Sequence, residues 1–142
     1  MGRIIGLDVG EARIGVAVSD PMGIIAQPHK VIPGTKKNES MNGILELFKE
    51  FDISTLVIGI PKNLHGNLSK QGESIKKWVE KLQKKIPVCN IEFWDERHTS
   101  KQAHRVLSEG TKKSRREKGN VDMLSAVFIL QSYLDNKSDK EN

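Results

Sequence analysis

The sequence predicts an α/β fold in which a mixed sheet of five strands is flanked by helices. First, residues 3–9 form an apolar run without strict alternation, which is typical of a strand covered on both faces. Second, a β-rich run at residues 13–19 follows after a short turn, which favours an antiparallel hairpin. Third, helical stripes and short strands alternate from residue 41 onward, as in sheets whose parallel strands are joined by crossover helices.

The chain is expected to open with a three-stranded antiparallel meander. Residues 3–9 form its first and most buried strand, and residues 13–19 pair with it. Asp20–Gly23 predicts the second turn. The third extended stretch covers residues 24–32 and contains Pro28, which lacks the N–H that a central strand needs. We therefore expect the third strand at an edge of the sheet.

Two helices and two strands are expected next, in alternation. The first helix is indicated by apolar residues at helical spacing: Met41, Ile44, Leu47, Phe48 and Phe51. The second has a similar stripe with lysines on its other sides: Ile75, Trp78, Val79, Leu82 and Ile86. Strands are expected at residues 55–60, ended by Pro61, and at residues 88–94, after Pro87. Right-handed crossovers would place residues 55–60 beside the first strand and residues 88–94 outside them.

The C-terminal third is expected to be mainly helical. Thr99 is interpreted as the N-cap of a helix over residues 100–109. The final helix, residues 121–134, is apolar nearly all round and should be buried. Residues 135–142 are interpreted as a polar, disordered tail. The predicted organisation is one domain over residues 1–134, followed by that tail.

Length and composition favour a single domain without a membrane-spanning segment. At 142 residues the chain suits one hydrophobic core, and no segment approaches the ~20 apolar residues of a membrane span. Its start lacks the apolar stretch of a secretory signal, so a cytoplasmic location is expected. Cys89 is the only cysteine and the four histidines lack zinc-site spacing, so any metal would be bound by oxygen.

Four acidic residues lie where chemistry is expected, at the carboxyl ends of strands or the start of a helix. Asp8 lies near the end of the apolar first strand, and Asp95 and Glu96 follow the last strand. Adjacent residues of an extended chain point to opposite faces, so only one of that pair should reach a given site. Asp122 opens the final helix and shares a face with Ala126, which is interpreted as the inward-facing side.

Each of these carboxylates also has a structural explanation when taken alone. Asp8 suits a turn cap, the Asp95–Glu96 pair suits a salt bridge with Arg97, and an acid is favourable at a helix N-terminus. Together, three carboxylates from separate elements at one sheet edge are better explained by Mg²⁺ or Mn²⁺, which prefer oxygen ligands. Two such ions can activate a water and stabilise the leaving oxygen of a phosphodiester. The grouping therefore predicts nuclease chemistry.

Positive charge is concentrated close to these acids in the sequence. The chain has a net charge of +5, and residues 97–118 contain eight Lys or Arg against two Glu. Such a segment suits a polyanion, because Lys and Arg that contact phosphates release counterions. A solvated loop is the alternative when the segment is taken alone. Aromatic residues make up only 5% of the chain, which argues against extensive base stacking and favours recognition by shape and charge.

Four blocks of sequence occur in a recognisable order over nearly the whole chain. They are Ile5–Gly10 with Gly15–Asp20, Gly59–Asn63, Asp95–Ser100, and Val121–Asp122 leading into Ala126–Leu134. In this order they resemble the YqgF (RuvX) family of bacterial ribonuclease-H-like proteins, described as pre-16S rRNA nucleases and as Holliday junction resolvases. A lone GLDxG turn is weak evidence, since actin-like ATPases and sugar kinases share it, but four blocks in order are specific. The resemblance implies a ribonuclease-H-like fold.

The resemblance also implies roles for individual residues. Asp8, Glu96 and Asp122 match the family's catalytic and metal-binding acids. In that fold the basic run beside Asp122 is interpreted as a phosphate-contacting loop. Substrate contacts are then expected from Arg13, Lys62, Asn63, Arg97, Lys112, Lys113, Arg115, Arg116 and Lys118. For the first four of these, exposure for solubility is an almost equally good explanation.

The chain departs from the pattern of the family at one position and from the pattern of classical resolvases at another. Ser125 stands where a small residue, often alanine, is expected, and Gly59–Ile60–Pro61 replaces the acid that classical resolvases carry at the fourth strand's end. The second departure disfavours resolvase activity and implies a metal site assembled in a different way.

The expected activity is metal-dependent hydrolysis of phosphodiester bonds in structured nucleic acid, with precursor 16S ribosomal RNA preferred and with two Mg²⁺ or Mn²⁺ ions. Four-way DNA is the alternative substrate, and a resolvase would need a two-fold homodimer. A non-catalytic nucleic-acid-binding module in transcription or ribosome assembly is an alternative of another class. An actin-like kinase or ATPase would need a second domain, for which 142 residues leave no room.

Overall fold

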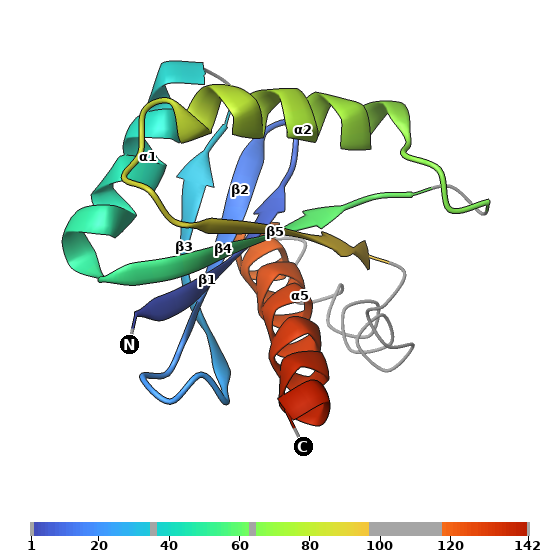
Figure 1. Cartoon of the computed structure of the whole chain (residues 1–142). Helices are drawn as coiled ribbons and strands as arrows, with labels where there is room; N and C mark the ends of the chain where they lie inside the picture. Colours follow the sequence, from blue (N-terminus) through green and yellow to red (C-terminus); the bar gives the residue numbers. More distant parts are fainter. Residues whose placement is uncertain (1, 35–36, 63–64, 97–117, 142) are drawn as a thin grey trace.

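The computed structural model describes residues 2–34, 37–62, 65–96 and 118–141. The five strands form one sheet, and Figure 1 shows helices on both sides of it. In chain order the described elements are β1 (Arg3–Val9), β2 (Arg13–Ser19), β3 (Ala26–Pro33), α1 (Lys37–Glu50), β4 (Ile53–Ile60), α2 (Lys70–Gln83), β5 (Asn90–Asp95) and α5 (Lys118–Glu141).

The strands form one mixed sheet in the order β3-β2-β1-β4-β5. Strands β1 and β2 are antiparallel, as are β2 and β3, whereas β4 runs parallel to both β1 and β5. The predicted meander and the predicted placement of the last two strands are therefore confirmed. Pro28 lies on the edge strand β3, as expected of a residue without an N–H, and the register shifts next to it, between Val16 and Ala17.

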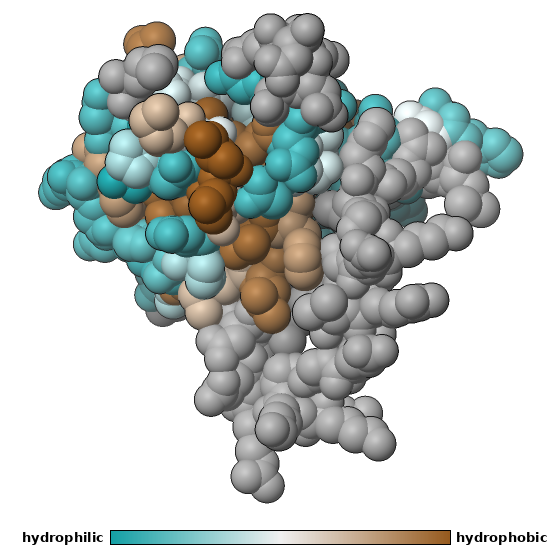
Figure 2. Space-filling model, turned by 90° about the horizontal axis from the view of Figure 1, so that it is seen from below, coloured by the Kyte–Doolittle hydropathy of each residue, from teal (hydrophilic) through white to brown (hydrophobic). Residues whose placement is uncertain are grey.

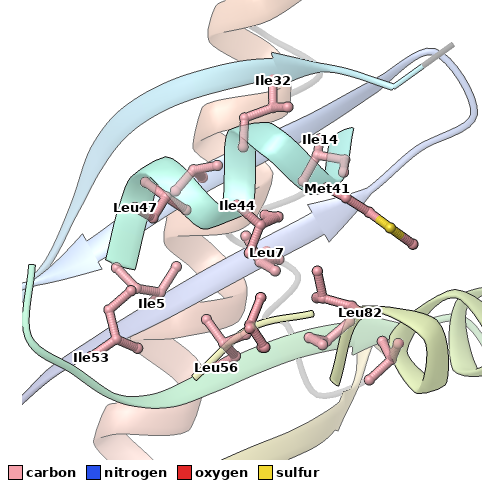
Figure 3. Packing of buried hydrophobic residues seen from close by; sticks show 14 of the residues in the cluster. Ile5, Leu7, Ile14, Ile32, Met41, Ile44, Leu47, Ile53, Leu56 and Leu82 are labelled. Carbon is pink, nitrogen blue, oxygen red and sulfur yellow. The ribbon is translucent and has the colours of Figure 1, made fainter. Parts of the chain in front are cut away.

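The two faces of the sheet are covered by different helices (Figure 1). Helices α1 and α2 bury one face, where Ile5 and Leu7 of β1 belong to the larger hydrophobic cluster. Figure 3 shows Ile44, Leu47 and Leu82 of these helices pointing toward those strand residues. Because strand side chains alternate, the even-numbered residues of β1 face the other way, toward α5.

Helix α5 leaves no room for a side chain at two glycines of the strands that it covers. A Cβ atom added at Gly6 of β1 would lie 2.7 Å from Leu130 Cβ and 3.0 Å from the Ala126 carbonyl oxygen. A Cβ atom added at Gly59 of β4 would lie 2.5 Å from Ile129 Cδ1. Glycine in a strand interior is typical of such close approaches, since any larger residue would push the helix away.

Hydrogen bonds fasten α5 to both edges of the sheet. Gln131 accepts a bond from the Ala26 N–H at 2.8 Å and donates one to the Ile24 carbonyl at 2.9 Å. On the other side, the Trp94 indole N–H donates to Ser132 Oγ at 3.1 Å. The position of α5 across the sheet is therefore set from β3 as well as from β5.

The structure differs from the sequence-based expectation at several element ends. Strand β3 begins at Ala26 instead of residue 24, because Asp20 Oδ1 accepts the Ile24 and Ile25 N–H groups and so extends the turn. Strand β5 begins at Asn90 instead of residue 88, and the Val88 side chain is fully exposed.

The largest difference is at the C-terminus, where the expected polar tail is helical. Helix α5 continues to Glu141, and Gln131 donates to Asp135 Oδ1 at 3.0 Å across one helical turn. A helix that projects past the sheet needs no apolar face there, so polar composition did not end it. Thr99 and the helix expected over residues 100–109 lie outside the described residues. No helix in the described part of the chain is long and apolar enough to span a membrane.

Candidate active site

Asp8 lies on the α5 face of the sheet, near the carboxyl end of β1. Ile5 and Leu7 belong to the cluster under α1 and α2, whereas Ile4 belongs to the cluster under α5 and Gly6 touches that helix. The alternation of strand side chains places Asp8 with Ile4 and Gly6. Asp8 is half-buried. Its carboxylate therefore lies where the central strand emerges from beneath α5.

The Asp95–Glu96 pair is divided between the two faces. Asp95 pairs with Ile60 of β4 and is buried, with 9% of its surface exposed. A Cβ atom added at Gly59, which touches α5, would lie 3.2 Å from Glu96 Oε1. Glu96 therefore shares the α5 face with Asp8, and the expectation that the two neighbours point apart agrees with this geometry.

The first turns of α5 point toward the same edge of the sheet. Leu134 packs in the cluster that contains Ile4, while Ala126 and Leu130 contact Gly6, so α5 runs antiparallel to β1. Helix α5 therefore begins on the side of the sheet toward which β1 ends, and Asp122 belongs to its first turns. The Asp122 side chain lies outside the described part of the structure.

The expected substrate-binding residues are described only in part. Arg13 opens β2 and lies on the α5 face, because Ala17 of the same strand belongs to the α5 cluster. Lys62 follows β4 and pairs with Leu68 in an isolated bridge. The structure does not describe Asn63, Arg97, Lys112, Lys113, Arg115 and Arg116, nor the side chain of Lys118, the first residue of α5.

Two of the three acids that were expected to bind metal have described side chains. Asp8 and Glu96 offer carboxylate oxygens on one face, which is the donor type that Mg²⁺ and Mn²⁺ prefer. Among the described side chains, no group of three His, Cys, Asp or Glu is arranged to bind a metal. The third expected ligand, Asp122, is not among them.

Two glycines that allow α5 to pack closely near the acids were not among the residues predicted from the sequence. Gly6 lies two residues before Asp8, and Gly59 lies beneath Glu96. Both interrupt runs of Ile, Leu and Val, and glycine within a strand indicates close approach of another backbone or a ligand. That pattern could have located the site-bearing face from sequence.

In the described part of the chain, cavities open on both sides of this arrangement. The larger, about 570 Å³, lies between the β2–β3 turn and the far end of α5, with Ile4 and Leu134 in its wall. Figure 2 shows the molecule from below, where apolar side chains form a patch bordered by hydrophilic ones. The smaller, about 180 Å³, is lined by Val9 and Gly10, directly after Asp8. The smaller cavity is therefore next to Asp8 in sequence, although Asp8 itself does not line it.

Solved structures with the same arrangement identify the class of fold. Thermus thermophilus RuvC in complex with a Holliday junction superimposes with a TM-score of 0.59 at 11% identity, covering 96% of each chain. The Fowlpox virus resolvase in its junction complex superimposes with a TM-score of 0.58 at 9% identity, covering 95% of this chain and 98% of that one. The fold is thus the ribonuclease-H-like fold of these resolvases.

Sequence comparison narrows the class to one family. Residues 2–136 match the family model described as "RuvX: Holliday junction resolvase", and the chain belongs to this family. A Clostridioides difficile relative is 43% identical over 136 residues, covering 96% of each chain. A Sulfurihydrogenibium relative is 47% identical over 139 residues, covering 97% of this chain and 93% of that one. Both are named "Putative pre-16S rRNA nuclease". The family resemblance seen in the sequence is confirmed.

Proposed function

We propose that this protein is a nuclease that hydrolyses phosphodiester bonds in structured nucleic acid, with precursor 16S ribosomal RNA as its substrate. The observation that carries the proposal is that Asp8 and Glu96 share the α5 face at the carboxyl edge of the sheet, while Asp95 lies on the other face. Membership of the RuvX family and the names of its close relatives support the same activity.

Divalent cations fit the residues proposed to form the site. Asp8, Glu96 and Asp122 would hold Mg²⁺ or Mn²⁺, because all three offer only carboxylate oxygen. When bound, two such ions supply an activated water and stabilise the leaving oxygen of the phosphodiester. The charge of the ions also lets a polyanion approach acids that would otherwise repel it.

The chain's own residues position the substrate and protect the acids. Close packing of α5 on Gly6 and Gly59 keeps Asp8 and Glu96 at the border of the core, which limits their motion. Arg13 emerges on the α5 face from β2, and Lys62 follows β4 on the other side of β1, so both suit contacts to phosphates beside the cleaved bond. The basic segment over residues 97–118 would extend these contacts along the backbone of the substrate.

A four-way DNA junction is the second candidate substrate. The family model is described as a Holliday junction resolvase, and two of the solved structures with this fold are complexes with junction DNA. Precursor RNA is favoured because the relatives at 40–47% identity carry the rRNA name and because Gly59–Ile60–Pro61 lacks an acid at the end of β4.

The two substrates can be separated by one comparison. Purified protein is incubated with a precursor 16S RNA fragment or a four-way DNA junction, each with Mg²⁺, Mn²⁺ or EDTA. We expect cleavage of the RNA with either metal and none with EDTA. Symmetric cutting of the junction, together with a two-fold dimer in solution, would show that the protein is a resolvase and would contradict the RNA substrate. Metal-independent binding without cleavage of either substrate would contradict nuclease activity and favour a binding module.

A further inference from the structure

The smaller cavity has the composition of a ligand site. Val9, Ile14 and Trp78 give it an apolar wall, and Glu11, Gln71 and Ser74 also line it. The three polar side chains are exposed, whereas Trp78 is half-buried and packs against the core. Apolar walls with a few polar groups are typical of sites that bind a small ring system in a defined orientation.

The size of the cavity restricts what could enter it. Its volume is about 180 Å³, below the roughly 300–1,000 Å³ of sites for drug-sized ligands. One flat heterocycle suits that space better than a whole nucleotide or a peptide. An aromatic wall favours stacking, and a carboxylate and an amide suit the amino and ring N–H groups of a nucleobase.

The cavity lies beside the candidate active site but on the other face of the sheet. Gly10, two residues after Asp8, forms part of its wall, and the turn to β2 contributes Glu11. A strand that passes over the carboxyl end of β1 could therefore place a phosphate near Asp8 and an adjacent base in the cavity. A base that enters the cavity must be unpaired, because pairing would occupy its polar edge.

Helix α2 adds a row of positive charge beside the cavity. At 100° per residue, Gln71, Ser74 and Trp78 form one stripe of the helix, next to the buried stripe. Lys70, Lys77 and Lys81 form the next stripe outward. The lysines thus follow the solvent side of the cavity over about 16 Å of helix, since each residue adds about 1.5 Å.

We propose that this cavity binds one unpaired nucleobase of the substrate, next to the cleaved phosphodiester, while Lys70, Lys77 and Lys81 contact the phosphates that follow it. The proposal rests on the proposed nuclease function and adds a site of base recognition to it. Outside the cavity, the substrate is recognised by its shape and charge. The cavity therefore makes cleavage depend on where the substrate has an unpaired base.

The test measures binding separately from cleavage. The Asp8→Asn protein is titrated in Mg²⁺ with short fluorescein-labelled single-stranded RNAs, each carrying an abasic site at a different position. Loss of a stacked base weakens binding by about tenfold. We expect that loss at one position in the series, and we expect it to vanish in the additional Ser74→Phe variant, whose ring fills the cavity. Equal losses at every position, or an unchanged loss in the Ser74→Phe variant, would overturn the base pocket.

A second pair of variants tests the lysine stripe. Lys77→Gln and Lys76→Gln make the same charge change at adjacent residues, but Lys76 lies on the other side of α2, with its Nζ 5.1 Å from the Phe93 ring centroid. We expect Lys77→Gln alone to reduce the slope of log affinity against log salt by roughly 0.7. Equal effects of the two changes would contradict the proposal that the lysine stripe contacts phosphates.

Thermal melting shows whether each variant folds, and the double variant Glu11→Ala, Gln71→Ala replaces Ser74→Phe if that protein is unfolded. The double variant removes the polar partners of the base but keeps Trp78, and it should reduce the position-dependent loss. Cleavage of precursor RNA is measured separately with wild type. Position-dependent binding without any cleavage would contradict the proposed function alone, whereas metal-dependent cleavage without position-dependent binding would contradict the pocket alone.

Discussion

The two faces of the sheet use opposite means of covering the same strands. Toward α1 and α2, strands β1 and β4 present large side chains, among them Leu7 and Ile58, which fill a thick apolar layer. Toward α5 they present Gly6, which meets the helix backbone at Ala126, and Gly59, which meets the side chain of Ile129. One face is built for burial of apolar area, and the other is built for proximity between a helix and strands that carry acids.

This difference explains why the candidate acids are found on one face only. A thick layer of Leu and Ile would hold a carboxylate on a helix far from carboxylates on strands. Gly6 and Gly59 interrupt that layer close to Asp8 and Glu96, on the face that α5 covers. The proposed chemistry therefore depends on close helix packing as well as on the acids themselves.

The largest effect is expected from a comparison of variants at the two neighbouring acids, Asp95 and Glu96. Glu96→Gln should lower cleavage by several orders of magnitude, because it removes a proposed metal ligand on the α5 face. Asp95→Asn makes the same change one residue away on the opposite face and should have a much smaller effect. Single-turnover cleavage rates of the two variants measure the contrast. A stronger loss in Asp95→Asn would mean that the wrong face was assigned.

The next effect concerns the basic segment over residues 97–118, which follows Glu96 in the sequence. If Lys112, Lys113, Arg115 and Arg116 contact phosphates, changing all four to Gln should weaken binding to every sequence. The slope of log affinity against log salt should flatten by roughly 0.7–0.9 per lost contact. Fluorescence anisotropy over a salt series gives both values. An unchanged slope would return the segment to the role of a solvated loop.

Packing on the two faces can be compared directly with two glycine-to-alanine changes. Gly6→Ala places a methyl group against the backbone of α5, which cannot move independently, and should destabilise the fold by about 1–3 kcal/mol. In Gly43→Ala of α1 the new methyl would lie 2.5 Å from Cγ2 of Ile32, a buried β-branched side chain with little rotamer freedom. Alanine favours the helix by about 1 kcal/mol, so the net loss should be smaller than at Gly6. Urea unfolding measures both. Equal losses would mean that α5 is no more tightly constrained than α1.

The smallest effect concerns the turn that precedes β3, away from the site. Backbone N–H bonds, first from Ile25 and then from Ile24, hold the pKa of Asp20 below its ordinary value of 3.8. The resulting stabilisation is present above that ordinary pKa and disappears as the pH falls through the lower folded-state pKa. Asp20→Asn should therefore melt slightly below wild type at neutral pH, and the gap should close in acid. Asp52→Asn, a change at an exposed site outside the turn, controls for net charge. If both variants showed the same pH dependence of melting, Asp20 would have no specific role in stabilising the turn.

Much of the architecture was predictable because it depends on local patterns. Apolar periodicity and the short connections gave the strand order, and alternation separated Asp95 from Glu96. The closeness of α5 was harder to predict, because it depends on which residues of β1 and β4 meet the helix. The length of α5 was also missed, since polar residues past Leu134 gave no apolar stripe that would extend the helix.

The central claim is that Asp8 acts as a metal ligand at the edge where α5 meets the sheet. The most direct measurement compares the cleavage rates of wild type and Asp8→Asn on precursor RNA in Mg²⁺, with melting in EDTA as a control. Asn removes one of several mutually repelling charges at nearly constant volume, so the metal-free variant should be as stable as wild type or slightly more stable. Its cleavage rate should fall by several orders of magnitude. A rate near that of wild type would contradict the claim, because Asn can replace Asp as a turn cap but not as a charged ligand.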